Sequence, residues 1–106
     1  MIRHIVLLRL RPEVTDAEIG PVFAEIHALQ GVLPGLRTVA SGRSESPERM
    51  ERGYLHGMVV EFDDWAALHT YLEDPRHRAA GARLVAAAQG GPDGILVFDL
   101  PDIAKP

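Results

Sequence analysis

An Asp-Pro step, Asp74-Pro75, constrains the fold of this chain more than any other feature because it separates two helical patterns. Proline disfavours the α conformation in the residue before it and fits the first turn of a new helix. The Asp74 carboxylate can accept hydrogen bonds from the free backbone N–H groups of that new helix. The step therefore fixes the angle between two helices, with Tyr71 before the corner and His77 after it.

The remaining segments predict further strands and helices. The Ile-, Val- and Leu-rich stretch from Ile2 to Leu10 predicts a strand. The capping box Thr15-Asp16-Ala17-Glu18 begins a helix that should end by Gln30-Gly31. We expect strands at 36–42, 54–62 and 95–100, a short helix after Asp63 or Asp64, a helix over 75–89, and an exposed polar loop over 43–53.

This order is β-α-β-β-α-β, with the second helical unit broken at Pro75. It predicts one α+β domain over residues 1–106 with a ferredoxin-like, four-stranded sheet of the antiparallel type. We expect the first and third strands to lie side by side and parallel, with the helices on one face of the sheet. The opposite face is expected to be uncovered in a single copy of the chain.

Strand alternation indicates which side chains meet the helices. Even positions of the first strand are the more apolar and should face the helices: Ile2, His4, Val6, Leu8 and Leu10. The uncovered face should carry Ile5, Leu7, Leu55 and Val59, which are too apolar to leave in water. A second copy could cover that face by burying ~1,200–2,000 Å² in total. We therefore expect a homodimer through the open face of the sheet.

Two further expectations concern the same dimer. Arg9 and Glu61 should lie on the open face of adjacent strands, where they could form an ion pair. The tail from Pro101 to Pro106 carries no core pattern and could lie along a neighbouring subunit.

Composition excludes several classes of protein. The formal net charge is -4, whereas a nucleic-acid-binding domain normally shows a basic face. The chain has no cysteine, which excludes disulfides and thiol catalysis. No signal peptide is expected, and no apolar run approaches the ~18 residues of a membrane span. We expect a cytoplasmic protein without nucleic-acid or membrane partners.

Four short segments, taken together and in this order, form a family pattern: His4-Ile5-Val6-Leu7, Leu33-Pro34-Gly35, Tyr71-Leu72-x-x-Pro75-x-His77 and Val97-Phe98-Asp99. Together they resemble the stress-responsive dimeric α/β-barrel (Dabb) family over nearly the whole chain. The resemblance implies small ferredoxin-like domains whose sheets pack face to face into a dimeric barrel, with a pocket between sheet and helices. Many members have no assigned activity. One branch, the plant polyketide (olivetolic acid) cyclases, closes a linear polyketide by an aldol reaction that uses a Tyr and a His.

The resemblance implies site residues at four positions of this chain. The catalytic histidine falls on His77 and the catalytic tyrosine on Tyr71, while two further pocket histidines fall on His4 and His56. A pocket tyrosine of the cyclase branch has no counterpart, because its position is Ile26. We therefore expect His77 and Tyr71 to be catalytic and His4 and His56 to bind a small-molecule substrate.

The residues give this assignment some independent support. His4 and His56 each lie near the start of a strand, on the same alternation face, so we expect them at the same end of the sheet within reach of His77. A neutral imidazole can abstract a proton α to a carbonyl, and a tyrosine hydroxyl can donate to the enolate oxygen that forms. The structural alternative is that His77 only stabilises the corner and Tyr71 only fills the core.

Three functions follow from this pattern. The first is a cofactor-independent lyase or cyclase acting on a polyketide-like or aromatic compound. The second is a non-catalytic, stress-responsive dimer that binds a small ligand or is structural. The third is a cofactorless monooxygenase. A zinc site formed by His4, His56 and His77 is conceivable, but no His-x-x-x-His pair accompanies it, and we expect no metal at these site residues.

Overall fold

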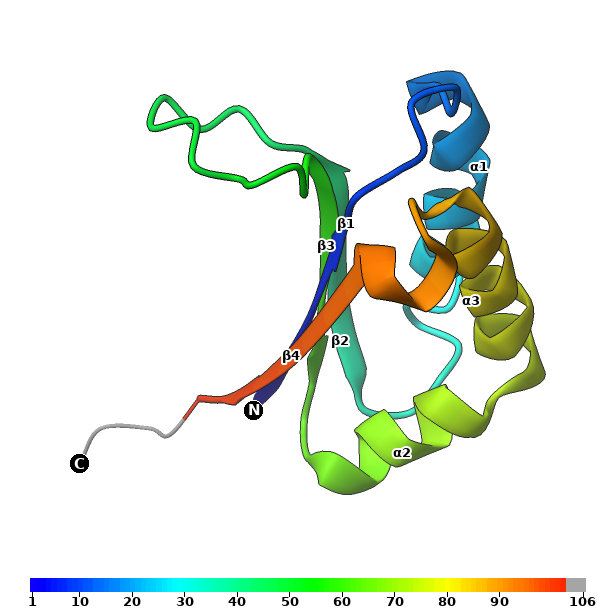
Figure 1. The fold of residues 1–106 in the computed structure, drawn as a ribbon. Helices are drawn as coiled ribbons and strands as arrows, with labels where there is room; N and C mark the ends of the chain where they lie inside the picture. The colour runs from blue at the N-terminus through cyan, green and yellow to red at the C-terminus, as the bar shows by residue number, and fades with distance from the viewer. Residues whose placement is uncertain (103–106) are drawn as a thin grey trace.

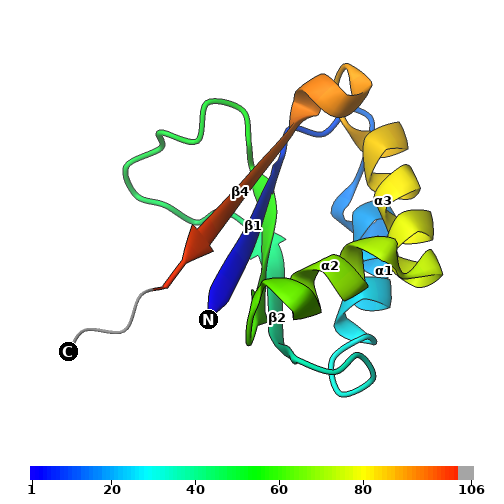
Figure 2. The same ribbon diagram turned by 90° about the horizontal axis from the view of Figure 1, so that it is seen from below.

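The computed structural model describes residues 1–102 and forms two layers, a four-stranded sheet and a layer of helices on one of its faces (Figure 1). Seen from below, the helices again lie on one side only (Figure 2). The elements, in chain order, are β1 (Ile2–Leu8), α1 (Asp16–His27), β2 (Leu36–Arg43), β3 (His56–Phe62), α2 (Trp65–Glu73), α3 (Pro75–Ala87), the 3₁₀ helix η1 (Gly91–Gly94) and β4 (Ile95–Pro101). No helix of the described residues is long and apolar enough to cross a membrane.

The predicted ferredoxin-like α+β arrangement is confirmed, and the strand order is β2-β3-β1-β4. The predicted direction of the central pair is wrong. β1 and β3 are neighbours, but they are antiparallel, with Ile2 opposite Phe62 and Leu8 opposite His56. The connections explain this result. A helical crossover lets β1 and β2 run in the same direction, whereas the loop after β2 reverses the chain, so β3 is antiparallel to both.

This register also corrects the predicted ion pair between Arg9 and Glu61. Arg3 lies directly opposite Glu61, and its Nε is 3.1 Å from Glu61 Oε2. The Arg9 guanidinium instead lies 4.7 Å from the centre of the Tyr54 ring and donates a 2.7 Å hydrogen bond to the Arg52 carbonyl. Arg9 therefore holds the base of the loop between β2 and β3.

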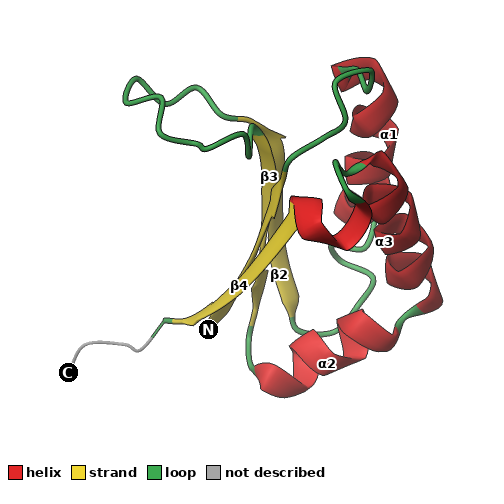
Figure 3. Ribbon diagram, in the orientation of Figure 1, coloured by secondary structure: helices red, strands yellow, loops and turns green. Residues whose placement is uncertain are grey.

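Most predicted elements are present, with boundaries shifted by a few residues. β1 ends at Leu8 rather than Leu10, and Leu10 makes an isolated bridge to Ala88. β3 begins at His56, two residues later than predicted, and α1 and α3 end earlier. The 3₁₀ helix η1 was not predicted. The polar segment after β2 forms a loop that projects on the uncovered side of the sheet (Figure 3).

The predicted assignment of β1 side chains to the two faces of the sheet is confirmed. Ile2, His4, Val6 and Leu8 of β1 are buried against the helices, whose core positions include Ile19, Phe23 and Leu68. The opposite face carries large exposed apolar side chains: Leu7, Leu55, Leu96, Phe98 and Leu100. The core of the protomer therefore lies between the sheet and the helices. The opposite face of the sheet is not covered by any of the described residues.

The corner at Asp74-Pro75 forms as predicted. Asp74 has extended backbone angles (φ -66°, ψ 132°) and ends α2, and its carboxylate Oδ1 accepts a 2.8 Å hydrogen bond from the Arg76 backbone N–H at the start of α3. The Arg76 guanidinium also donates to both carboxylate oxygens, at 3.0 and 2.9 Å. These hydrogen bonds lower the pKa of Asp74 to about 2. The cap and the ion pair together fix the angle between α2 and α3.

Two glycines of the turn between α1 and β2 allow a matched test of this packing. Gly31 and Gly35 both have φ near +80°, but a Cβ at Gly35 would lie 2.6 Å from Ala67 Cβ of α2, whereas a Cβ at Gly31 meets nothing within 4 Å. We expect Gly31→Ala to lower the free energy of unfolding by about 1–2 kcal/mol through backbone strain alone. We expect Gly35→Ala to cost a further ~1–3 kcal/mol from overpacking. Urea denaturation of both variants measures the difference, and equal losses would contradict the contact with α2.

Candidate active site

Three of the four predicted site residues meet beneath the corner between α2 and α3. Tyr71 from α2 and His77 from α3 lie with their ring centres 4.3 Å apart. His4 from β1 lies edge-on to Tyr71 at 5.9 Å, and Phe62 from β3 lies 5.1 Å from Tyr71. The corner therefore places a phenol and two imidazoles in one cluster against the helix-facing side of the sheet.

His4 is oriented by a carboxylate that sequence reasoning did not single out as a site residue. His4 Nδ1 lies 2.6 Å from Asp99 Oδ1 on the neighbouring strand β4, where the two residues are directly opposite. A carboxylate only accepts, so His4 Nδ1 carries the proton and Nε2 is free to accept. Aspartate is depleted in strands, and its presence within the apolar run Ile95–Leu100 was the available signal.

The Tyr71 hydroxyl is buried and has no hydrogen-bond partner among the residues that the structure describes. Burial disfavours the charged phenolate and raises the pKa of Tyr71 well above its usual value. The hydroxyl therefore remains protonated. An unpaired buried hydroxyl is costly, so a hydrogen bond from it to a bound ligand would be favourable. None of the described residues competes for this hydrogen bond.

His77 is half-buried and has the geometry of a base. Its Nδ1 lies 3.3 Å from the Leu72 carbonyl oxygen, which can only accept, so Nδ1 carries the proton and Nε2 has the free lone pair. Burial lowers the pKa of His77, and the contact with Leu72 opposes this shift. The neutral, proton-accepting form is therefore favoured near neutral pH.

This lowered pKa predicts how stability depends on pH. The unfolded chain binds a proton at His77 near pH ~6.5, whereas the folded chain binds it only at lower pH. The contribution of His77 to the free energy of unfolding should therefore be retained above pH ~6.5 and should decrease as the pH falls from there through the folded-state pKa. Urea denaturation of wild type and His77→Gln between pH 8 and 5 checks this. A gap between the two proteins that widens with acidification in favour of wild type would contradict it.

His56 does not join this cluster, and the prediction that His4 and His56 lie at one end of the sheet is wrong. Because β1 and β3 are antiparallel, His4 lies opposite Val60 and His56 lies opposite Leu8. Val60 and His56 are four positions apart, a span of roughly 13 Å along the strand. His56 Nε2 instead lies 2.8 Å from Asp16 Oδ1 at the start of α1. A substrate contact by His56 stays a prediction.

Because His56 lies far from His4, the zinc site considered for His4, His56 and His77 cannot form. Within residues 1–102, no three His, Asp or Glu side chains gather closely enough to hold a metal ion. The cluster under the corner offers imidazole and phenol groups, and these can move protons and donate hydrogen bonds.

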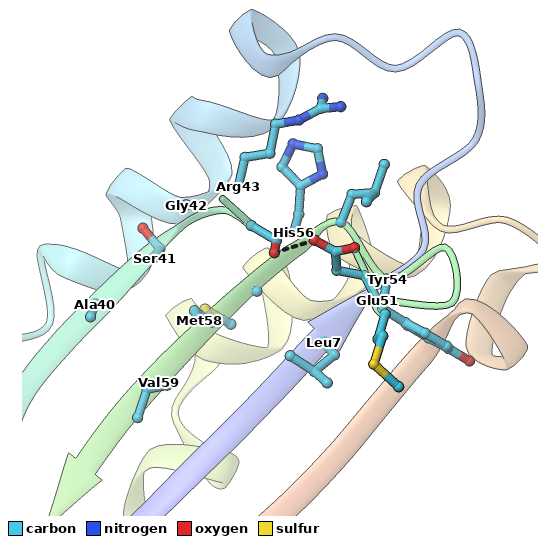
Figure 4. A pocket seen from close by; sticks show the side chains of 14 residues that line it. Leu7, Ala40, Ser41, Gly42, Arg43, Glu51, Tyr54, His56, Met58 and Val59 are labelled. Atoms are coloured by element: carbon cyan, nitrogen blue, oxygen red, sulfur yellow. Dashed lines mark hydrogen bonds between the residues drawn. The ribbon is translucent and has the colours of Figure 1, made fainter. Parts of the chain in front are cut away.

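Outside this cluster, the residues that the structure describes line two cavities. The larger, of about 520 Å³, lies between the loop after β2 and the open face of the sheet, and its lining includes Leu7, Met50, Tyr54 and Val59 (Figure 4). The smaller, of about 260 Å³, lies between α1 and α3 and includes Arg11 and Arg83. Neither is lined by Tyr71, His77 or His4.

Known proteins share both the sequence pattern and the fold. Olivetolic acid cyclase from Cannabis sativa is 25% identical over 80 residues, which cover 76% of this chain and 79% of that protein. A dimeric ferredoxin-like protein of unknown function from Jannaschia sp. CCS1 is 36% identical, with a TM-score of 0.90 over 95% of this chain and 98% of that one. Hydroxynitrile lyase from Passiflora edulis is 20% identical, with a TM-score of 0.81 over 99% and 96% of the two chains.

The family resemblance seen in the sequence is confirmed by a family model. The model of the stress responsive A/B barrel domain, Dabb, matches residues 2–102, which is nearly the full length of the chain. The chain therefore belongs to the stress responsive A/B barrel domain family.

Proposed function

We propose that this protein is a small acid–base enzyme, a lyase or cyclase that acts on a polyketide-like or aromatic carbonyl compound without a cofactor. The observation that carries the proposal is the buried Tyr71 hydroxyl, unpaired within the described part of the chain, beside a half-buried His77 whose Nδ1 contacts Leu72 and leaves Nε2 as the acceptor. Similarity to a cyclase over most of the chain supports the reaction class. The likeness to hydroxynitrile lyase supports the fold alone.

The proposed reaction is an aldol closure in which atoms and charges balance. His77 Nε2 removes a proton α to a carbonyl, and the electron pair moves into the carbonyl to give an enolate. Tyr71 donates a hydrogen bond to the enolate oxygen as its charge develops. The enolate carbon then attacks a second carbonyl carbon of the same molecule, and the resulting alkoxide takes the proton back from the His77 imidazolium.

His4 is proposed as the residue that binds a substrate oxygen or orients the Tyr71 hydroxyl. Asp99 holds its Nδ1 proton, and this hydrogen bond fixes the tautomer and the orientation of the ring. His4 also contacts the edge of Tyr71 and Phe62 within the buried cluster. We therefore assign Asp99 a positioning role that acts through His4.

We also propose that the protein is a homodimer through the open face of the sheet. Three solved structures that share this fold are described as dimeric, with TM-scores of 0.90, 0.75 and 0.67. The open face carries exposed Leu7, Leu96 and Phe98, which water would otherwise contact. Light scattering on the purified protein should give twice the mass of the 11.6 kDa chain.

The direct test of the activity offers wild-type protein three substrates: a linear poly-β-ketone thioester, an aromatic cyanohydrin and an electron-rich phenol under air. Carbon–carbon bond formation or cleavage in the first two supports the acid–base proposal. Oxygen consumption with the phenol alone supports the monooxygenase alternative. Saturable binding without turnover of any of them supports the non-catalytic dimer.

Replacing Tyr71 by phenylalanine should separate stability from activity. The change removes a buried hydroxyl that has no partner among residues 1–102, so we expect the free energy of unfolding to stay equal or to rise by about 1 kcal/mol. The same change removes the donor to the enolate, and we expect kcat to fall about 10²–10³-fold with little change in KM. A large loss of stability would instead mean that the hydroxyl is bonded within the folded protein. Tyr54→Phe, at a half-buried tyrosine outside the cluster, is the matched control.

A further inference from the structure

We propose that the second copy of the chain completes the candidate active site by holding β4, and with it Asp99, against β1. The inference rests on the proposed dimer and on the proposed role of His4. It differs from both because no residue of the partner needs to enter the site. The partner contacts the open face of β4, and Asp99 lies on the helix-facing side of the same strand.

β4 is one of the two edge strands of the sheet, and β1 is the strand beside it. Large apolar side chains along it are 42–62% exposed: Leu96, Val97, Phe98 and Leu100. Edge strands with few buried contacts are the segments that open locally at low cost. In a single protomer, β4 is therefore expected to separate from β1 more often than the central strands separate from each other.

The same short stretch of β4 carries the interface and the site on opposite faces. Asp99 lies opposite His4 and points to the helix side, where it bonds the imidazole. Its neighbours Phe98 and Leu100 lie opposite Ile5 and Arg3 on the open face. Because successive residues of a strand alternate between faces, pressing Phe98 and Leu100 onto a partner fixes the backbone of Asp99.

A second copy of this chain is the occupant that fits the open face. Leu96 and Phe98 continue the apolar surface of Ile5, Leu7 and Val59 across the sheet, in register. Its rim carries charges of both signs, since Arg3 binds both Glu61 and Asp102 within the protomer. Two such faces therefore meet without an excess of like charge, as self-association requires. The structure related by 36% identity is itself described as dimeric.

The test compares three variants by light scattering, amide hydrogen exchange and the ¹H signal of the His4 Nδ1 proton. Phe98→Asp should give a monomer in which the Leu96 and Leu100 amides exchange at least about tenfold faster relative to Val60 of β3, and the His4 signal should be lost. Asp99→Asn should remain a dimer with a protected β4 but an altered His4 signal. Val32→Asp, at an exposed apolar residue in the turn after α1, should match wild type.

A rescue experiment excludes a merely local effect of the new charge. The chain has no cysteine, so Leu7→Cys and Leu96→Cys, which are directly opposite in the β1–β4 register, can form a single staple within the protomer. In the Phe98→Asp background this staple should restore the His4 signal while the protein stays monomeric. Failure of the oxidised staple to restore it would overturn the inference.

The outcomes separate the inference from the proposals beneath it. A monomeric Phe98→Asp protein with unchanged β4 protection and an unchanged His4 signal overturns the coupling but leaves the site as proposed. A wild-type protein that is monomeric, yet has a protected β4, overturns both the dimer and the coupling. Loss of the His4 signal with loss of β4 protection in the monomer, reversed by the staple, supports the coupling.

Discussion

Replacing His77 by alanine is expected to lower the rate of the proposed reaction by about 10²–10⁴-fold, the usual contribution of a general base. The change removes Nε2, the proton acceptor that the Leu72 contact leaves free. It should act mainly on kcat, because the proposed hydrogen bond from Tyr71 to the substrate remains. Steady-state kinetics on whichever carbonyl compound proves to be a substrate measures the effect.

The matched control is His69→Ala on α2, where the imidazole is exposed and lies outside the cluster. It should leave kcat and KM unchanged. Added imidazole should restore part of the activity of His77→Ala if the lost group is a base, and a purely structural role for His77 would not respond to it. Equal rates for wild type and His77→Ala would remove His77 from the mechanism.

Replacing Phe62 by alanine should have the largest effect on stability, a loss of about 3–5 kcal/mol in the free energy of unfolding. Phe62 is fully buried at the end of β3 and supports both Tyr71 and His4, with ring centres 5.1 and 6.4 Å away. The cost combines lost burial with the cavity that remains. Urea denaturation followed by circular dichroism measures it.

Two further variants keep this test interpretable. Phe62→Leu fills more of the space and should cost considerably less, which gives a folded protein even if the alanine variant unfolds. Trp65→Ala truncates a larger aromatic side chain that is 47% exposed at the start of α2, and should change stability by less than about 1 kcal/mol. A cost for Phe62→Ala no greater than that for Trp65→Ala would contradict the burial of this ring.

The sequence was sufficient for features that depend on local spacing. The alternation of β1 identified the buried face and the open face, and the corner at Pro75 followed from proline chemistry together with the capping carboxylate of Asp74. Tyr71 and His77 flank that corner within six positions of each other, so local geometry alone could bring them together. These predictions needed no knowledge of which strands pair.

Features that depend on long-range pairing were predicted less well. The direction of β3 relative to β1 decides whether His56 lies beside His4 and whether Arg9 can reach Glu61, and nothing in the local pattern of β3 reports that direction. The connections would have given the answer, since a loop reversal after a crossover makes the inserted strand antiparallel. Asp99 was missed as a positioning residue for a related reason, because its partner lies 95 positions away in the sequence.

The carboxylate of Asp74, which fixes the corner between α2 and α3, loses its charge at a much lower pH than an imidazole does. With a pKa of about 2, the carboxylate contributes its stabilising contacts above its unfolded value near 3.8 and loses them only as the pH falls through 2. Between pH 4 and 8 the Asp74 carboxylate therefore stays ionised and keeps the contacts that fix the angle between α2 and α3. A change of activity within that interval is therefore not expected to come from loss of the Asp74 cap.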